Sequence, residues 1–429
     1  MVGSARARPR RAASPWVLVI VAVAVVAVVA VVAAAWAAVR APFSVAGPTS
    51  AGPTSAGPTS AGPTSAGPTS AGLTSAVASP TPTPTPPDVL AGWSLEQKVG
   101  QLFVVGLDLT APQAVSSDAV RADHVGNVFL HGRTTAGAAG VRAQVAGFTA
   151  LVSSDTTHGE PMLVAVDQEG GQVQSLQGSG FSRIPAATAQ AGVAPDTLRA
   201  QATTWGGELA AVGVDLDLAP VMDLVPAATA TQNPPIGRLH RSYGFTADSV
   251  TTHAEAFSAG MQASGVAVAV KHFPGLGRVT ANTDTTAGVT DTVTGRDDPS
   301  VEVFHSGIRA GVDAVLMSTA VYTLIDPTAP AAFSPTVVTG LLRGDLGFDG
   351  VVITDDLSAA TQVAAWSPAD RAVLAISAGC DLVLVSKDPT VTHAMVAAVV
   401  AKAQADPAFA AQVDVAARRV LALKARLAA

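Results

Sequence analysis

The sequence contains a single cysteine, Cys380, among 429 residues. It therefore cannot form an intrachain disulfide, a cysteine-based zinc site or an iron–sulfur cluster, so its stability must come from packing. Aromatic residues make up 4% and charged residues 13% of the chain. The 25 basic and 32 acidic residues give a net charge of −7. An acidic surface does not release counterions from a phosphate backbone, so this composition disfavours a nucleic-acid-binding protein.

Several catalytic motifs are also missing. The patterns HExxH, GxSxG, GxGxxG and the Walker phosphate loop do not occur, and the eight histidines show no paired metal-ligand spacing. We therefore expect neither a metal nor a cofactor.

Long apolar runs are confined to one place. Residues 16–39 are uncharged and apolar, long enough to cross a hydrocarbon core of about 30 Å. Four arginines lie in residues 1–15 and only Arg40 follows closely. By the positive-inside rule, 1–15 is a cytoplasmic basic segment, 16–39 is a transmembrane anchor and the rest is extracytoplasmic. A cleaved signal peptide, which would make the protein secreted, is the alternative.

Residues 40–87 are rich in Ala, Gly, Pro, Thr and Ser. Five copies of Ala-Gly-Pro-Thr-Ser run from Ala46 to Ser70, a sixth carries Leu73, and SPTPTPTPP ends at Pro87. Such a segment has too little apolar surface to offset the entropy of ordering, so we expect a disordered stalk. An inert low-complexity expansion explains the repeat equally well.

The remaining segment, 88–429, alternates short β-branched runs with Ala-rich helical stretches. Eight runs suit buried parallel strands: 103–106, 127–130, 163–166, 214–218, 266–270, 314–317, 350–354 and 382–385. Predicted helices include 197–213, 247–263 and 367–378, with two more after the last strand. This pattern predicts an α/β fold, a (β/α)8 TIM-type barrel, with an open doubly wound sheet as the alternative.

Polar clusters directly follow three of the predicted strands, at residues 167–171, 271–275 and 355–356. A barrel carries its chemistry at these carboxyl ends. Each cluster alone also has a structural explanation: the two aspartates would cap a helix starting near Leu357, the glycines would form a turn, and Lys271 would pair with an acid. Together, carboxylates and hydrogen-bonding groups at three strand ends are the equipment of glycoside hydrolysis.

Six segments in order resemble the signatures of one family: SLEQKVGQLF (94–103), VDQEGGQVQ (166–174), LAPVMDL (218–224), NPPIGRLHRSYG (233–244), KHFPGLG (271–277) and ITDDLSAA (353–360). They are similar to glycoside hydrolase family 3, in its single-domain β-N-acetylglucosaminidase branch of actinobacterial membrane-tethered type. The resemblance implies a retaining double displacement with Asp355 as the nucleophile. It also implies four residues that bind sugar hydroxyls: Asp167, Arg241, Lys271 and His272.

The resemblance has a gap in the loop after KHFPG. Members of this branch carry Asp-Ser-His there, and its histidine is the acid/base, whereas this chain has Asp284, Thr285 and Thr286 in a loop two residues longer. A threonine hydroxyl holds its proton too tightly to act as an acid near neutral pH. We therefore expect Asp284 to act as the acid/base when the 274–296 loop closes over a sugar.

These observations predict an exo-acting, retaining β-N-acetylglucosaminidase at the cell membrane, monomeric, with a carbohydrate substrate in cell-wall fragments. Two alternatives stay open. One is a carbohydrate-binding pseudoenzyme that keeps the sugar-binding residues. The other is a glycosidase, transferase or phosphorylase with a different acid/base.

Overall fold

The computed structural model describes residues 88–429. The predicted cytoplasmic segment 1–15, membrane anchor 16–39 and stalk 40–87 lie outside these residues. Among the helices of residues 88–429, none has the length and apolar character needed to cross a membrane.

Eight parallel strands form one sheet and follow one another around it in chain order. They are β1 (Phe103–Asp108), β2 (Asn127–His131), β3 (Leu163–Val166), β6 (Leu216–Asp217), β7 (Ala267–Phe273), β9 (Ala314–Met317), β12 (Val351–Thr354) and β13 (Val383–Val385). Each of the eight predicted apolar runs overlaps one of these strands.

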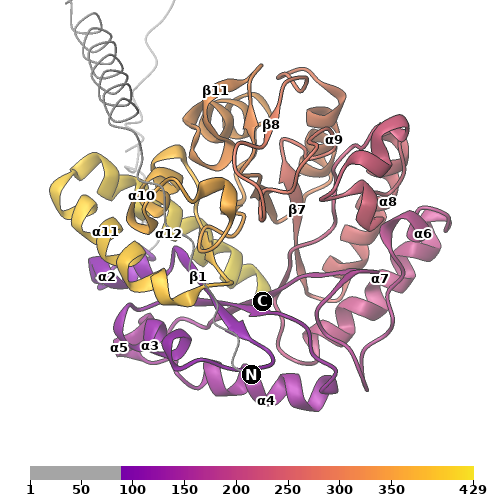
Figure 1. Cartoon of the computed structure of the whole chain (residues 1–429). Coiled ribbons are helices and arrows are strands. Elements are labelled where there is room, and N and C mark those ends of the chain that lie inside the picture. Colours follow the sequence, from indigo (N-terminus) through magenta and orange to yellow (C-terminus); the bar gives the residue numbers. More distant parts are fainter. Residues whose placement is uncertain (1–87) are drawn as a thin grey trace, which may run out of the picture. The chain divides into compact units, whose positions relative to one another are not determined.

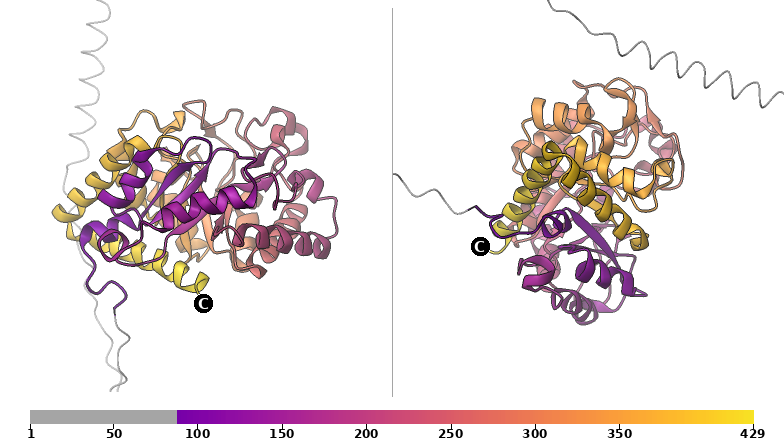
Figure 2. Two further views of the ribbon diagram at one scale, coloured as in Figure 1. Left: turned by 90° about the horizontal axis from the view of Figure 1, so that it is seen from below. Right: turned by 90° about the vertical axis from the view of Figure 1, so that its left-hand side faces the viewer.

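The sheet curls into a nearly closed, barrel-like ring. The first strand pairs with the last, with Phe103 opposite Val383, and a bridge from Ile353 to Leu382 joins β12 to the start of β13. The early and late parts of the chain accordingly lie side by side (Figures 1 and 2). An open doubly wound sheet does not have this order, so that alternative is wrong.

Side chains alternate between the inside of the ring and the helical layer around it. On β1, Val104 belongs to the inner cluster, whereas Phe103 and Val105 pack in the outer one. Every strand of the ring or the residue beside it contributes to the inner cluster, and Val420 and Leu423 of α12 (Pro407–Leu427) complete it. The interior is therefore a packed core and the chemistry must lie at its rim.

Helices precede, connect and follow the strands. They are α2 (Leu95–Gly100), α3 (Ala114–Ala122), α4 (Gly137–Thr149), α5 (Ser154–Thr157), α6 (Ala187–Gln190), α7 (Pro195–Ala210), α8 (Ala247–Ala263), α9 (Pro299–Arg309), the π-helix η4 (Thr336–Asp345), α10 (Pro368–Ala378) and α11 (Thr392–Ala405). Short 3₁₀ turns are η1 (Ala227–Gln232), η2 (Gly237–Leu239), η3 (Ala331–Phe333), η5 (Thr361–Val363) and η6 (Pro389–Val391). The five predicted helices are confirmed as α7, α8, α10, α11 and α12.

Three of these helices begin in the same way. Asp298, Ser367 and Asp406 each accept a main-chain N–H of the first turn, and a proline follows each of them. The side chain satisfies an N–H that has no partner within the helix, and the proline has none to lose. Acceptor–proline pairs therefore set where α9, α10 and α12 start.

Small elements that the sequence patterns did not predict build the rim. A hairpin of β4 (Gln168–Gly170) and β5 (Val173–Gln174) follows β3, and β8 (Thr290–Asp291), β10 (Val321–Tyr322) and β11 (Asp326–Pro330) form a three-stranded sheet. No helix starts near Leu357 in the described chain, because the residues after Asp356 form turns and η5 before α10 begins.

Candidate active site

All six residues singled out in the sequence line one cavity of about 110 Å³ at the carboxyl ends of the strands. Asp167 follows β3, Lys271 and His272 end β7, and Asp355 follows β12. Arg241 comes from the loop after η2 and Asp284 from the loop after β7. Residues up to 188 positions apart thus converge, because parallel strands of a ring end at the same rim.

A charge cluster centred on Glu169 forms one wall of the site. The guanidinium of Arg241 donates to both oxygens of Glu169, at 2.8 and 2.7 Å. The ammonium of Lys271 lies 2.7 Å from Glu169 Oε1 and 2.5 Å from Asp167 Oδ1. Burial alone would raise the pKa of Glu169, but the charges of Arg241 and Lys271 outweigh it and lower the pKa to about 2. The wall therefore presents fixed, oriented donors and acceptors to a ligand.

A buried aspartate orients His272. Asp223 Oδ2 lies 2.7 Å from His272 Nδ1, while Asp223 Oδ1 accepts the main-chain N–H of Leu276 at 2.6 Å. The Arg241 guanidinium approaches His272 Nε2 at 3.4 Å. This arrangement favours the imidazole tautomer with its proton on Nδ1, donated to Asp223, and it fixes the plane of the ring.

Asp355 is half-buried, with its Oδ1 accepting the N–H of Asp356 at 2.8 Å. Burial and the negative charge of Asp284 together raise the pKa of Asp355 to about 6, although the charge of His272 opposes them. Asp356 stabilises the neighbouring backbone instead, because its Oδ1 accepts the N–H groups of Ser358 (3.0 Å) and Ser386 (2.9 Å). Asp355 lines both cavities of the site, whereas Asp356 lines only the outer one and holds the turn behind it.

Asp284 is exposed at the mouth, and its charge acts on Asp355. Thr285 and Thr286, which stand where the resemblance called for a serine and a histidine, are exposed. A second cavity of about 220 Å³ shares Asp167, Asp284 and Asp355 with the first. The two spaces therefore meet where the two predicted catalytic carboxylates stand.

Some residues of this region were missed by sequence reasoning. Glu169 and Asp223 lie inside motifs already singled out, but only the structure shows that one pairs with two cations and the other with a histidine. His131 and Lys387 line the outer cavity. His131 ends β2, so the rule that found the other strand-end clusters would have found it too.

Asp217 lies beneath the charge cluster and is fully buried. Its Oδ1 accepts the N–H of Gln168 at 2.9 Å, and its Oδ2 has no hydrogen-bond partner among the described residues. Burial, together with the charges of Asp167 and Glu169, raises the pKa of Asp217 to about 8. The neutral form of Asp217 is therefore favoured at neutral pH, which limits the negative charge under the site.

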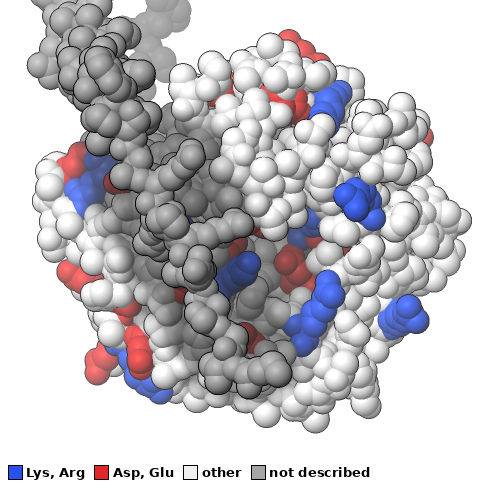
Figure 3. Space-filling view, viewed as in Figure 1, with Lys and Arg blue, Asp and Glu red and all other residues white. Residues whose placement is uncertain are grey.

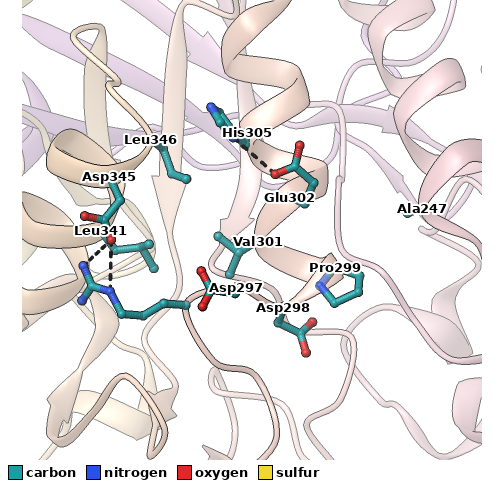
Figure 4. Close-up of a pocket in the computed structure, with 11 residues that line it drawn as sticks. Ala247, Asp297, Asp298, Pro299, Val301, Glu302, His305, Leu341, Asp345 and Leu346 are labelled. Carbon is teal, nitrogen blue, oxygen red and sulfur yellow. Dashed lines mark hydrogen bonds and ion pairs between the residues drawn. The ribbon is translucent and has the colours of Figure 1, made fainter.

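Another cavity, of about 510 Å³, contains none of the six residues. It lies beside the start of α9 and the end of η4, and two pairs of its side chains interact with one another (Figure 4). Asp345 pairs with Arg296 at 2.5 Å and Glu302 lies 3.3 Å from His305. Its size alone does not make it a catalytic site.

One face of the molecule carries few charged side chains (Figure 3). On the face shown in Figure 3, uncharged side chains predominate, and acidic and basic ones gather around a hollow near the middle. Among residues 88–429, no group of three or more histidine, cysteine or acidic side chains is placed to hold a metal ion.

A ring of parallel strands with opposed carboxylates and a Lys–Glu–Arg cluster at its rim defines an enzyme of the glycoside hydrolase class. The profile of the glycosyl hydrolase family 3 N-terminal domain matches residues 94–423. The chain belongs to this family, as its motifs indicated, and it is a glycoside hydrolase acting on O-glycosidic bonds.

Comparison with named proteins also supports this family assignment. The chain is similar to a β-N-acetylhexosaminidase structure from Beutenbergia cavernae, with 63% identity over 77% of this chain and 98% of that one, and a TM-score of 0.77. A family 3 β-N-acetylglucosaminidase structure from Paenibacillus has 33% identity over 78% and 63% of the two chains, and a TM-score of 0.71. A β-hexosaminidase from Xanthomonas oryzae pv. oryzae is 34% identical over 307 residues, covering 68% of this chain and 86% of that protein.

Proposed function

We propose that the protein is an exo-acting, retaining β-N-acetylglucosaminidase. The observation that carries the proposal is the meeting of two cavities at Asp355 and Asp284. The small inner cavity would take one terminal sugar, and the outer one would take the leaving group. The relatives described as hexosaminidases support N-acetylglucosamine as that sugar.

In the first step, the Asp355 carboxylate attacks the anomeric carbon while the bond to the leaving oxygen breaks. Asp284 gives its proton to that oxygen, and a covalent glycosyl-enzyme forms on Asp355. In the second step, Asp284 takes a proton from a water that attacks the same carbon, the bond from that carbon to the Asp355 oxygen breaks, and the sugar leaves with its original configuration. Asp167, Lys271, His272 and Arg241 hold the sugar hydroxyls and orient the ring.

The test compares Asp355→Asn with its neighbour Asp356→Asn. Asp355→Asn removes the nucleophile, so kcat/KM should fall by roughly 10⁴-fold or more on both an aryl β-N-acetylglucosaminide and a natural disaccharide. Asp356→Asn keeps the Oδ1 acceptor for Ser358 and Ser386, so it should be much milder. Circular dichroism should show both variants folded, and a 5-fluoro N-acetylglucosaminyl fluoride should label wild-type Asp355.

The variant Asp284→Ala tests the proposed acid/base role separately from that of the nucleophile. A nitrophenolate leaves without a proton whereas a sugar alkoxide does not, so disaccharide cleavage should fall by about 10²–10⁴-fold while aryl glycoside kcat/KM is nearly retained. Wild-type behaviour of Asp284→Ala on the disaccharide would place the acid elsewhere. Binding of N-acetylglucosamine by a wild type that cleaves neither substrate would make the protein a binding module instead.

We also propose that the enzyme works outside the cytoplasm, tethered by residues 16–39, on cell-wall fragments. The apolar run, the arginines before it and the predicted stalk support this location.

A further inference from the structure

The loop after β7 carries Asp284 and is fixed at its beginning. The side-chain amide of Asn233 donates to the carbonyls of Leu276 and Val279, at 2.8 and 2.9 Å. Asn233 is buried, so water does not compete for these bonds. The loop therefore leaves β7 in a defined direction.

Its central part is held by η5. The main-chain N–H of Gln362 donates to Thr283 O at 3.0 Å, and the N–H and hydroxyl of Thr361 both donate to Asp284 O, at 3.1 and 2.9 Å. The side-chain amide of Gln362 pairs with Val289 in both directions: its Oε1 accepts the N–H at 2.8 Å and its Nε2 donates to the carbonyl at 3.0 Å. Five hydrogen bonds thus dock the Asp284 segment on two consecutive residues.

The same support carries Asp355. η5 follows Asp355 closely in the chain, and the guanidinium of Arg371 fixes the stretch between them by donating to Leu357 O and Ser358 O, at 2.8 and 3.0 Å. Gln362 is only 5% exposed, so its amide pair with the loop is shielded from water. One rigid piece of backbone therefore locates both carboxylates.

The Asp284 carboxylate itself depends on this backbone. No protein group of the described chain hydrogen-bonds its oxygens, and the side chain is exposed. Its place above the cavity is set by where Thr283, Asp284 and Val289 are held. A displacement of about 1 Å between a catalytic group and its target can cost about 10²-fold in rate.

We propose that Gln362 is a positioning residue for leaving-group protonation, through its double amide pair with Val289 and its main-chain bond to Thr283. This inference rests on the proposed role of Asp284. Gln362 lines neither of the two cavities at the site. It determines how far the Asp284 proton stands from the glycosidic oxygen.

The experiment measures kcat/KM of Gln362→Met in the full-length protein on a dinitrophenyl β-N-acetylglucosaminide and on N,N′-diacetylchitobiose. Methionine keeps the length of the side chain but cannot pair with Val289. We expect a loss of about 10–100-fold on the disaccharide and a change within about threefold on the aryl glycoside. Thr361→Val, which removes only the hydroxyl bond to Asp284, should show a smaller split in the same direction.

Gln97→Met is the matched control. Gln97 is also buried and its amide donates to a loop carbonyl, Ser154 O at 2.9 Å, but it belongs to α2, which precedes β1. The variant Gln97→Met should lower the melting temperature about as much as Gln362→Met does. It should reduce disaccharide and aryl glycoside cleavage equally, since it changes only the fraction of protein that is folded.

The double variant Gln362→Met/Asp284→Ala should be no slower on the disaccharide than Asp284→Ala alone, because a group that is absent cannot be misplaced. Equal losses of Gln362→Met on both substrates, or additive losses in the double variant, would overturn the positioning role while leaving that of Asp284 intact. Wild-type disaccharide cleavage by Asp284→Ala would overturn the proposed acid/base, and the positioning role with it.

Discussion

At the residue scale, the site separates carboxylates by their surroundings. Glu169 lies between two cations and keeps its charge, whereas Asp355 lies near another carboxylate and has a raised pKa. Asp217 is buried, no group of residues 88–429 hydrogen-bonds its Oδ2, and its raised pKa of about 8 favours the neutral form. The carboxyl group therefore has three different roles here: Glu169 is a structural anion, Asp355 is the candidate nucleophile, and Asp217 is a buried group that favours its neutral form.

The raised pKa of Asp355 predicts the acid side of the pH profile. The nucleophile must be ionised, so kcat/KM on an aryl glycoside should rise as the pH increases through about 6 and fall about tenfold per unit below it. Because the Asp284 charge contributes to this rise, Asp284→Asn should move the acid limb to lower pH. Asp356→Asn serves as the comparison, and an acid limb that Asp284→Asn leaves unmoved would contradict the coupling.

At the scale of elements, α12 closes the amino-terminal end of the barrel. Its Val420 and Leu423 complete the inner core, and the ammonium of Lys424 donates to Gln101 Oε1 at 2.7 Å and Gly126 O at 3.1 Å. Burial lowers the pKa of Lys424 to about 7, although Glu160 and Asp215 oppose this. The helix thus places an ionisable group where its charged form is disfavoured.

The variant Lys424→Met should reveal the lowered pKa of Lys424 through the pH dependence of the free energy of unfolding. The lowered pKa means that, between about pH 7 and 10.5, the unfolded chain binds a proton that the folded chain has released. Wild-type stability should therefore gain about 1.4 kcal/mol per pH unit in this range relative to the variant.

Melting temperatures at pH 6, 8 and 10 would measure this difference, which should grow with pH in favour of the wild type. Lys402→Met, at a half-exposed position on α11, is the control and should show no such divergence. Parallel pH dependences of wild type and Lys424→Met would show that Lys424 is not titrating in this range.

At the scale of the whole molecule, residues 88–429 contain every residue of the candidate site. The catalytic body should therefore not need the membrane segment for its chemistry.

Limited proteolysis of membranes from the outside tests this independence together with the proposed topology. The full-length protein should pellet with membranes, and protease should cut within the predicted stalk and release a body with unchanged specific activity. Release of an inactive body would contradict the independence. A mature N-terminus within residues 33–46 recovered from the medium would show cleavage and secretion instead of an anchor.

Eight strands, five helices and the six residues that line one cavity could all be predicted from the amino-acid sequence alone. Strand and helix patterns are local, so periodicity and composition suffice to find them, and ordered motifs are specific enough to identify the family. The expectation of a helix near Leu357 failed because Asp356 uses its side chain in a turn with Ser358, a choice that depends on its additional bond to Ser386.

The pairing of charged side chains, in contrast, depends on the tertiary structure. Glu169 and Arg241 are 72 positions apart, and Asp167 and Lys271 are 104 apart. The docking of Asp284 on Thr361 spans 77 positions. No local pattern encodes such contacts, since they exist only once the first strand has paired with the last and all eight carboxyl ends face the same rim.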